Sequence, residues 1–253
     1  MSPVRFHGDP PSHLTFPALE RLGVLHASST RHCPGVTPAS EPVAPFERVG
    51  PEVLRKAGLD LSRMVYLNQV HGDDVRRVDG NTRGFAGDGD ILLTATPKVP
   101  LSIFTADCLA VILVAPRRPL LSLAHVGWRG MVQGALEKAV AAMGEAGARP
   151  EALWAAISPS IGPCCYEVDQ PVIDPLSRAF PDAWRRWVTP RGEGKWMLDL
   201  WQADHDQLVG AGVRPEQVLN PRLCTSCRLD LYFSYRREGS TGRLVTLAAL
   251  PTG

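Results

Sequence analysis

The chain has 253 residues, and its 44% hydrophobic and 21% charged residues are ordinary values for a globular protein, which exclude a disordered or fibrous chain. Its 27 Lys and Arg residues nearly balance 26 Asp and Glu residues. No global field therefore attracts nucleic acid or an anionic membrane, and we expect neither as a partner. An anionic ligand has to be bound by local charges.

The beginning of the chain, MSPVRFHGDPPSHL, lacks the continuous apolar stretch and the cleavage site of a secretory signal. The longest apolar segment, residues 99–116, contains Asp107 near its middle and is followed by two arginines, which suits buried strands better than a bilayer span. We therefore expect a cytoplasmic protein, whose six cysteines are thiols, metal ligands or catalytic groups before they are disulfides.

The predicted elements mix strands and helices along the chain. Many prolines lie in residues 1–50 and prevent long helices there, so we expect strands and loops. Short apolar runs predict buried strands at residues 65–70, 90–96, 101–104, 110–115 and 120–124. Apolar spacing then predicts a helix over 131–143, a strand at 153–157, helices at 171–180 and 198–209, and a closing strand at 244–250.

This order predicts an α/β (α+β) fold, built as a layered sandwich of mixed β-sheets flanked by helices. A chain of this length can bury one sizeable core. No internal repeat or low-complexity linker divides the sequence. We therefore expect a single domain over residues 1–253.

Three of the apolar runs end in the same way, with a side chain able to bind metal beside a small or turn residue. These side chains are His71, Cys108 and His125. Strand ends can aim side chains into a shared cleft. Two imidazoles and a thiolate with an open fourth position are typical of catalytic zinc. Spacing alone leaves a second interpretation open, in which the cysteine and the two histidines are isolated from one another.

Five blocks of sequence carry evidence of another kind. They are NQVHG at 68–72, TADC at 105–108, AHVGWRG at 124–130, SIGPCCYEV at 160–168 and FSYRREGSTGR at 233–243. In this order they resemble the laccase-domain family, variously named polyphenol oxidase, peptidoglycan editing factor and purine nucleoside phosphorylase. One departure is the family's early block, Ser-Thr-Arg followed by Gly-Gly-Val, which is STRHCPGV at 29–36 here.

The resemblance implies a cytoplasmic enzyme with an α/β sandwich, a bound zinc, and activity on adenosine, inosine and S-methyl-5'-thioadenosine. The implied reactions are phosphorolysis, which releases the base and ribose 1-phosphate, and deamination of adenosine. The family's metal positions fall on His71, Cys108 and His125. The expected partners are a nucleoside and phosphate, and the expected assembly is a monomer or a weak homodimer.

Four arginines are candidates for binding the phosphate, because a guanidinium fork suits phosphate oxygens better than an ammonium group does. They are Arg31, Arg129, Arg236 and Arg243. Arg129 is the strongest candidate, since it precedes a predicted helix start and closely follows His125. For Arg236 and Arg243, each taken alone, a surface or salt-bridging role is the better prediction.

Two further polar residues are candidates for the substrate site. Deamination needs a group that moves protons near the metal, and Asp107, next to Cys108, is the candidate acid or base. Orienting a histidine is an equal alternative for Asp107. Gln69 could bind a ribose or base edge, although an amide beside a turn commonly stabilises the turn.

The remaining cysteines include Cys164, Cys165, Cys224 and Cys227, which could form a four-thiolate zinc site or a redox pair. A zinc ribbon normally presents two Cys-x-x-Cys pairs, and only one is present. The spacing therefore favours buried structural thiols.

Two other functions compete with phosphorolysis. One family name suggests a copper polyphenol oxidase, with copper in place of zinc. Multicopper laccases bind copper through His-x-His pairs, however, and none of the seven histidines here is two residues from another. The second is a metal-free cysteine hydrolase acting on cell-wall peptides, with Cys108 as nucleophile and His125 or His71 as its base.

Overall fold

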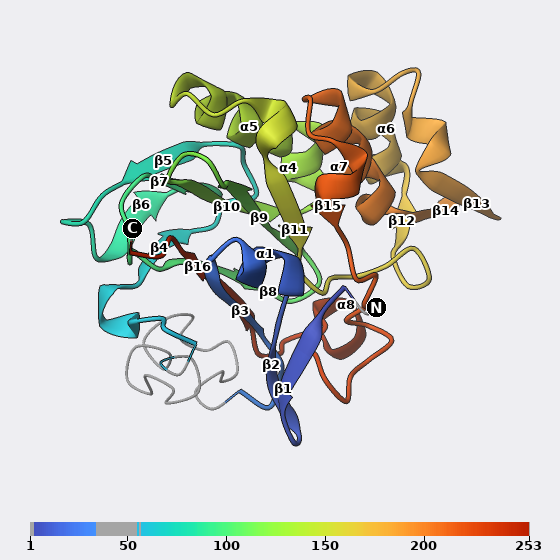
Figure 1. Ribbon diagram of the computed structural model, residues 1–253. Helices are drawn as coiled ribbons and strands as arrows, with labels where there is room; N and C mark the ends of the chain where they lie inside the picture. Colours follow the sequence, from blue (N-terminus) through green and yellow to red (C-terminus); the bar gives the residue numbers. More distant parts are fainter. Residues whose placement is uncertain (1–2, 34–54, 56, 253) are drawn as a thin grey trace.

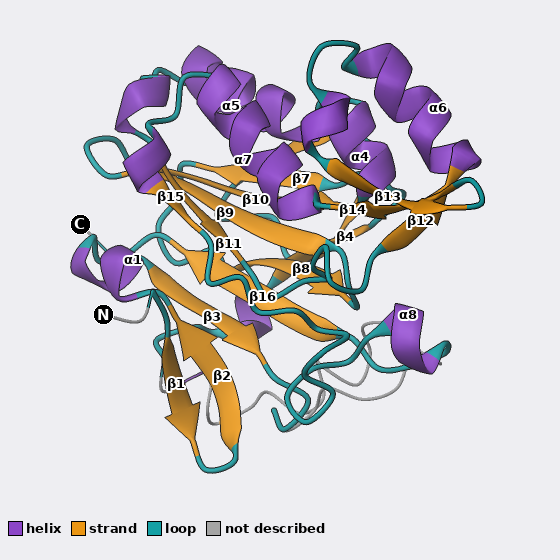
Figure 2. Ribbon diagram, turned by 90° about the vertical axis from the view of Figure 1, so that its right-hand side faces the viewer, coloured by secondary structure: helices purple, strands orange, loops and turns teal. Residues whose placement is uncertain are grey.

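The computed structural model describes residues 3–33, 55 and 57–252. Two large sheets stack on each other, and helices cover the outer face of one of them (Figures 1 and 2). The predicted α/β class and layered sandwich are therefore confirmed. The unusual STRHCPGV block continues past residue 33 and lies partly outside the described residues.

The first sheet has seven strands in the order β1-β2-β3-β16-β8-β4-β6. In that order they are Arg5–Gly8, Pro11–Thr15, Leu25–Ser29, Leu244–Ala249, Leu101–Thr105, Val65–Asn68 and Gly84–Asp88. The second sheet has six strands in the order β15-β11-β9-β10-β7-β5. They are Val218–Leu219, Trp154–Ile157, Leu109–Ala115, Leu120–Val126, Ile91–Thr94 and Val75–Val78.

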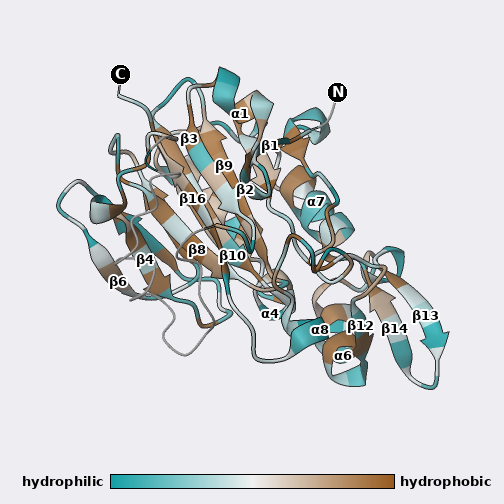
Figure 3. Cartoon of the chain, turned by 90° about the horizontal axis from the view of Figure 1, so that it is seen from below, coloured by the Kyte–Doolittle hydropathy of each residue, from teal (hydrophilic) through white to brown (hydrophobic). Residues whose placement is uncertain are grey.

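Strand β9 shows why the layers form. All of its residues are buried. Leu109 and Val111 pack in the core between the six-stranded sheet and the helices, whereas Ala110 and Ile112 pack in the core between the two sheets. Successive side chains of a strand point to opposite faces, so a strand covered on both faces is apolar throughout. Figure 3 shows the same concentration of hydrophobic residues in the central strands.

Among the described residues the α-helices are α1 Pro17–Arg21, α4 Trp128–Val132, α5 Ala135–Glu145, α6 Gln170–Ala179, α7 Leu200–Gly210 and α8 Tyr235–Glu238. Short 3-10 turns occur at Leu61–Arg63, Pro150–Ala152, Trp184–Arg186 and Pro215–Gln217. None of the described helices is long and apolar enough to cross a membrane.

The helix predicted over 131–143 is two helices in the structure. Gly134 separates α4 from α5 with φ of 78°, a left-handed conformation that glycine adopts at little cost. The break leaves α4 as a short helix of five residues, which starts directly after β10, where His125 lies.

A small third sheet was not predicted from the sequence. It has the order β12-β14-β13, formed by Glu167–Asp169, Lys195–Leu198 and Val188–Gly192. Strand β13 is mostly exposed and contains Pro190 and a terminal glycine. Such a strand has no apolar alternation to reveal it.

Candidate active site

Three side chains able to bind metal meet where the chain passes between the two large sheets. His71 follows β4, Cys108 lies in the turn between β8 and β9, and His125 is near the end of β10. Their ligand atoms lie within 4.8 Å of one another. The Cys108 sulfur is 3.8 Å from His71 Nε2, and the two imidazole rings pack edge to face. The group could hold a metal ion.

Asp90 supports two of these residues from behind. It is fully buried just before β7, and its Oδ1 accepts a hydrogen bond of 2.7 Å from His125 Nδ1. The carboxylate also accepts hydrogen bonds from the backbone N–H groups of His71 and Gly72, at 3.1 and 2.7 Å. Because Nδ1 is occupied, Nε2 of His125 is the nitrogen left for a metal.

The local charges favour a thiolate at Cys108. Burial alone would raise the pKa of this thiol, but the neighbouring His125 and His71 lower it to about 6. Burial would likewise lower the pKa of His125, whereas Cys108 and Asp90 raise it to about 9. A thiolate beside two imidazoles is a donor set typical of zinc.

The backbone around the group is unusually tight. Gly127 is the N-cap residue just before α4, and a Cβ there would lie 3.0 Å from His71 Cδ2 and 3.1 Å from the Cys108 sulfur. His71 has φ of 61° and Asp107 has φ of 94°, a region that residues other than glycine seldom occupy. Such conformations cluster at functional sites, where the surrounding structure maintains them.

Asp107 ties three segments together beside Cys108. Its Oδ1 accepts a hydrogen bond of 2.6 Å from the Thr225 hydroxyl, and its Oδ2 accepts one of 2.7 Å from the backbone N–H of Arg236. Its carbonyl oxygen accepts from the N–H of Ile161 at 2.9 Å. Asp107 thus holds the loop after β11 and the segment that runs into and includes the start of α8 against the group of His71, Cys108 and His125.

Tyr166 was missed in the sequence, although it belongs to one of the resembling blocks. The guanidinium of Arg236 lies 5.0 Å from the centre of its ring. Burial raises the pKa of Tyr166, and the thiolate of Cys108 raises it further, opposed by Arg236 and Arg129. Tyr166 therefore lies among the charged groups of the site. An aromatic residue directly after the Gly-Pro-Cys-Cys turn was the signal available.

The four candidate arginines differ in their surroundings. Arg129 lies in the first turn of α4 and stacks over Trp128, 4.4 Å from the ring centre. Arg31 pairs with Glu238 of α8 at 2.6 Å, while Arg243 donates to the carbonyl oxygens of Thr241 and Gly242. Arg129 and Arg236 are the two whose charge acts on Tyr166.

The side-chain amide of Gln69 is already used. Its Nε2 donates to the Phe104 carbonyl and its Oε1 accepts from the Phe104 N–H, both at 2.8 Å. These two bonds join the Gln69 side chain, just after the end of β4, to the backbone of β8. The substrate role of Gln69 stays a prediction, and the observed contacts of its amide are structural.

Comparison with known proteins places the chain in a family. Residues 48–251 match the family described as multi-copper polyphenol oxidoreductase laccase. The chain belongs to this family. The purine nucleoside phosphorylase YlmD of Geobacillus stearothermophilus is 37% identical over 199 residues, which cover 73% of this chain and 71% of that protein. A purine nucleoside phosphorylase of Xylella fastidiosa is 32% identical over 248 residues, 89% of this chain and 92% of the relative.

Two solved structures share nearly the whole fold of this chain. The Bacillus licheniformis hypothetical protein YfiH superposes with a TM-score of 0.90 at 28% identity, covering 99% of this chain and 100% of that one. YlmD of Geobacillus stearothermophilus gives a TM-score of 0.89 at 29% identity, with the same coverage. The family resemblance of the five sequence blocks is therefore confirmed.

Four of the other cysteines in this laccase-family chain were predicted to be buried structural thiols, and their exposure contradicts that prediction. Cys164 and Cys227 are exposed, Cys165 is half-buried, and only Cys224 among these four is buried. Their sulfur atoms lie within 4.8 Å of one another, so this group too could hold a metal ion. The error came from seeking a second Cys-x-x-Cys pair, whereas the fold completes the set with two adjacent cysteines.

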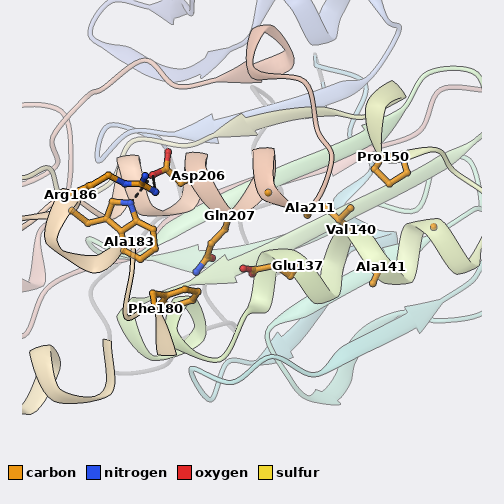
Figure 4. Close-up of a pocket in the computed structure, with 13 residues that line it drawn as sticks. Glu137, Val140, Ala141, Pro150, Phe180, Ala183, Arg186, Asp206, Gln207 and Ala211 are labelled. Atoms are coloured by element: carbon orange, nitrogen blue, oxygen red, sulfur yellow. Dashed lines mark hydrogen bonds and ion pairs between the residues drawn. The ribbon is translucent and has the colours of Figure 1, made fainter. Parts of the chain in front are cut away.

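A cavity of about 580 Å³ lies apart from both groups, lined by residues of α5, α7 and the segment around Trp187 (Figure 4). None of the predicted site residues lines it. The side chains of Glu137 and Gln207 point toward one another there, and Glu137 Oε2 and Gln207 Oε1 have no hydrogen-bond partner among the described residues. Burial raises the pKa of Glu137.

Proposed function

We propose that the chain is a zinc-dependent purine nucleoside phosphorylase that acts on adenosine, inosine and S-methyl-5'-thioadenosine and also deaminates adenosine. The observation that carries the proposal is the group of His71, Cys108 and His125 supported by Asp90. The phosphorylase names of its relatives supply the substrate class. A cytoplasmic location fits the free thiols of Cys164 and Cys227.

The residues present fit a catalytic zinc. His71 and His125 would bind through their imidazole nitrogens and Cys108 through its sulfur. The Asp90 hydrogen bond fixes the tautomer of His125 and so leaves its Nε2 for the metal. Three protein ligands are the usual number where a fourth position stays open for a ligand. A zinc ion bound here would act as a Lewis acid on an oxygen atom of water or substrate at the fourth position.

The substrate lies, in this proposal, between the metal-binding group and Tyr166. Phosphorolysis forms a bond from a phosphate oxygen to ribose C1' as the bond from C1' to the purine nitrogen breaks, and the electron pair leaves with the base. Arg129 and Arg236 hold the phosphate dianion, because the charges of both lower the pKa of Tyr166 and the guanidinium of Arg236 lies 5.0 Å from its ring centre. Deamination replaces the purine amino group with a water oxygen and releases ammonia.

The decisive experiment incubates the purified protein with adenosine, with and without phosphate, and identifies the products. We expect adenine and ribose 1-phosphate only when phosphate is present, and inosine in either case. The proposal would be overturned if protein with zinc occupancy near one at the His71 group released no free base and formed no inosine.

Arg129→Ala tests the phosphate role. We expect it to impair phosphorolysis more than deamination, because only phosphorolysis has to position a dianion. Arg185→Ala is the matched control, since Arg185 also stacks on the preceding residue, Trp184, at 4.8 Å from the ring centre. Equal losses in both reactions would mean that Arg129 positions the loop carrying His125.

A metal-free cysteine hydrolase acting on cell-wall peptides is a second candidate, favoured by the low pKa of Cys108 beside His125. In that mechanism the sulfur attacks a carbonyl carbon instead of binding metal. Chelated protein would then keep its activity, and alkylation of Cys108 would abolish it. Under the zinc proposal, chelation abolishes activity and added zinc restores it.

A further inference from the structure

Two segments far apart in sequence bring four thiols together outside the candidate active site. Cys164 and Cys165 lie in the loop between β11 and β12, and Cys224 and Cys227 lie in the segment between β15 and α8 (Figure 1). The Cys227 sulfur is 3.4 Å from the sulfur of Cys164 and 3.4 Å from that of Cys165. None of the four forms a disulfide.

The backbone holds these two segments in place. Ser160 and Cys224 form a parallel bridge, in which the Ser160 N–H donates to the Leu223 carbonyl at 3.2 Å and the Thr225 N–H donates to the Ser160 carbonyl at 3.1 Å. The Cys165 N–H closes a turn onto the Gly162 carbonyl at 3.0 Å. The thiols are therefore positioned by the fold before any ligand binds.

Gly162 sets how closely the loop can lie against the core. A Cβ at this position would be 2.4 Å from the ring of Trp201, so only glycine fits. Trp201 Nε1 in turn donates to the Ser160 hydroxyl at 2.7 Å. The Gly162 N–H donates to the Cys224 sulfur at 3.3 Å, a contact that stabilises negative charge on a thiolate.

The arrangement matches a closed metal site. Zinc binds sulfur at about 2.3 Å in a tetrahedron, which places neighbouring sulfur atoms about 3.8 Å apart. The observed separations of 3.4 Å, and the limit of 4.8 Å for the whole set, bracket that value. A disulfide would use two of the four sulfurs and leave the others crowded against it. Four sulfur donors leave no open position, as in structural zinc sites.

We propose that a structural zinc ion binds these four thiols and fastens the loop 161–166 to the segment 224–238. This zinc is separate from any metal at His71 and does not depend on the proposed activity. Both fastened segments reach the candidate active site, since Thr225 and Arg236 bond to Asp107 and Tyr166 stacks under Arg236. The second site acts on the first by holding these residues in position.

The test starts from Cys108→Ala, which lacks the sulfur ligand of the candidate active site. We expect this variant, purified in reducing buffer without added metal, to contain one zinc per chain by elemental analysis. Zinc X-ray absorption should show four sulfur atoms at about 2.3 Å. Zinc well below one per chain, iron or copper in its place, or a disulfide between Cys164 and Cys227 in the mass spectrum would overturn the proposal.

Substitutions at Cys227 supply the contrast. In the Cys108→Ala background, Cys227→Ser should lose the zinc, while Cys227→His should keep it with three sulfur ligands and one nitrogen. Cys33→Ser, outside both groups, is the control and should keep it unchanged. Retention of full zinc by Cys227→Ser with an unaltered absorption spectrum would contradict the assignment.

The wild-type protein separates this proposal from the proposed function. Two zinc ions per chain are expected if both proposals are right. If only the four-cysteine site binds metal, one zinc per chain is expected, and it should be lost on Cys227→Ser but not on Cys108→Ala.

Hydrogen exchange on the Cys108→Ala protein adds a measurement that does not depend on activity. Chelation should accelerate exchange in residues 224–238 and leave β9 unchanged, and equal protection with and without zinc would contradict the fastening role.

Discussion

Two fully buried aspartates have opposite electrostatic environments. They are Asp90, beside the group of His71, Cys108 and His125, and Asp204 in α7. Each has 0% of its surface exposed. Asp90 accepts hydrogen bonds from His125 and from backbone N–H groups, which outweigh burial and lower its pKa. Neither oxygen of Asp204 has a hydrogen-bond partner among the described residues. Burial, reinforced by the charge of Glu137, raises the pKa of Asp204 well above its ordinary value.

The difference shows that burial alone does not fix the charge of a carboxyl group. A carboxylate is stable in the interior when several donors replace the lost water, and it otherwise keeps its proton. Asp90 thus carries a charge that holds His125 in place, whereas Asp204 carries no comparable charge at neutral pH. The contrast identifies Asp90 as part of the site and leaves Asp204 as a source of instability.

Asp90→Asn should have the largest effect. The amide would turn a donor toward N–H groups that need an acceptor, and His125 would lose the partner that fixes its tautomer. We expect zinc affinity and turnover to fall by about ten- to a hundredfold, with a loss of about 1–3 kcal/mol in the free energy of unfolding. Metal titration, initial rates and urea denaturation measure the three.

Asp88→Asn is the control for Asp90, because Asp88 is exposed and, among the described residues, its carboxylate bonds only to the side chain of Asn68. It should match the wild type in all three measurements. Normal zinc affinity in Asp90→Asn would show that the His125 tautomer does not depend on this carboxylate. Asp90 would then have no role in metal binding that distinguishes it from Asp204.

Asp107→Asn should have a smaller effect, because both oxygens of Asp107 are engaged by Thr225 and Arg236. These contacts favour a positioning role over proton transfer. We expect full zinc occupancy and a turnover loss of about tenfold, near the lower end for a supporting residue. Thr225→Val, which removes one of the two donors, should lose activity in the same direction.

Proton transfer by Asp107 predicts another pattern. Turnover of Asp107→Asn would then fall by about two to four powers of ten with zinc still bound, and Thr225→Val would be nearly silent. Rates and zinc content measured in the same preparations distinguish the two roles.

The sequence predicted the layers well where burial repeats along a strand. The strands around residues 101–126 and the closing strand appear close to their predicted bounds, because apolar runs buried on both faces leave a strong signal. The third sheet and the break at Gly134 were missed, since exposed strands and single left-handed residues leave almost none.

The candidate site was predictable only in part. The resembling blocks pointed to His71, Cys108 and His125, each of which ends or follows a strand. Asp90 was not singled out, because an aspartate at the start of an apolar run looks like any turn residue, and its role depends on N–H groups some twenty positions away in sequence. Contacts between distant segments of this kind cannot be deduced from spacing.

The charge that Asp90 helps to organise can be measured at Cys108. In chelated protein we expect alkylation of Cys108 by iodoacetamide to rise through a midpoint near pH 6, compared with about 8.5 for an ordinary thiol. The thiolate is the reactive form, so reaction is lost as pH falls below that midpoint. Added zinc should protect Cys108. Peptide mapping isolates it from Cys33, whose pKa burial raises to about 11. A midpoint near 8.5 would contradict the thiolate pair with His125.

Asp204→Asn should have the smallest effect and the opposite sign. Because the pKa of Asp204 is raised in the folded state, the unfolded chain releases this proton as pH rises above about 4 while the folded chain keeps it, so the wild type loses stability with rising pH. Asparagine has the same shape and nothing to ionise. The variant should match the wild type near pH 3 and exceed it at pH 8, where each 1 kcal/mol regained raises Tm by about 2–4 °C for a chain of this size. Thermal melts across this range measure the difference. A gain that stayed constant with pH would mean that the amide found a new partner, and a loss at pH 8 would mean that Asp204 is ionised and held by a group outside the described contacts.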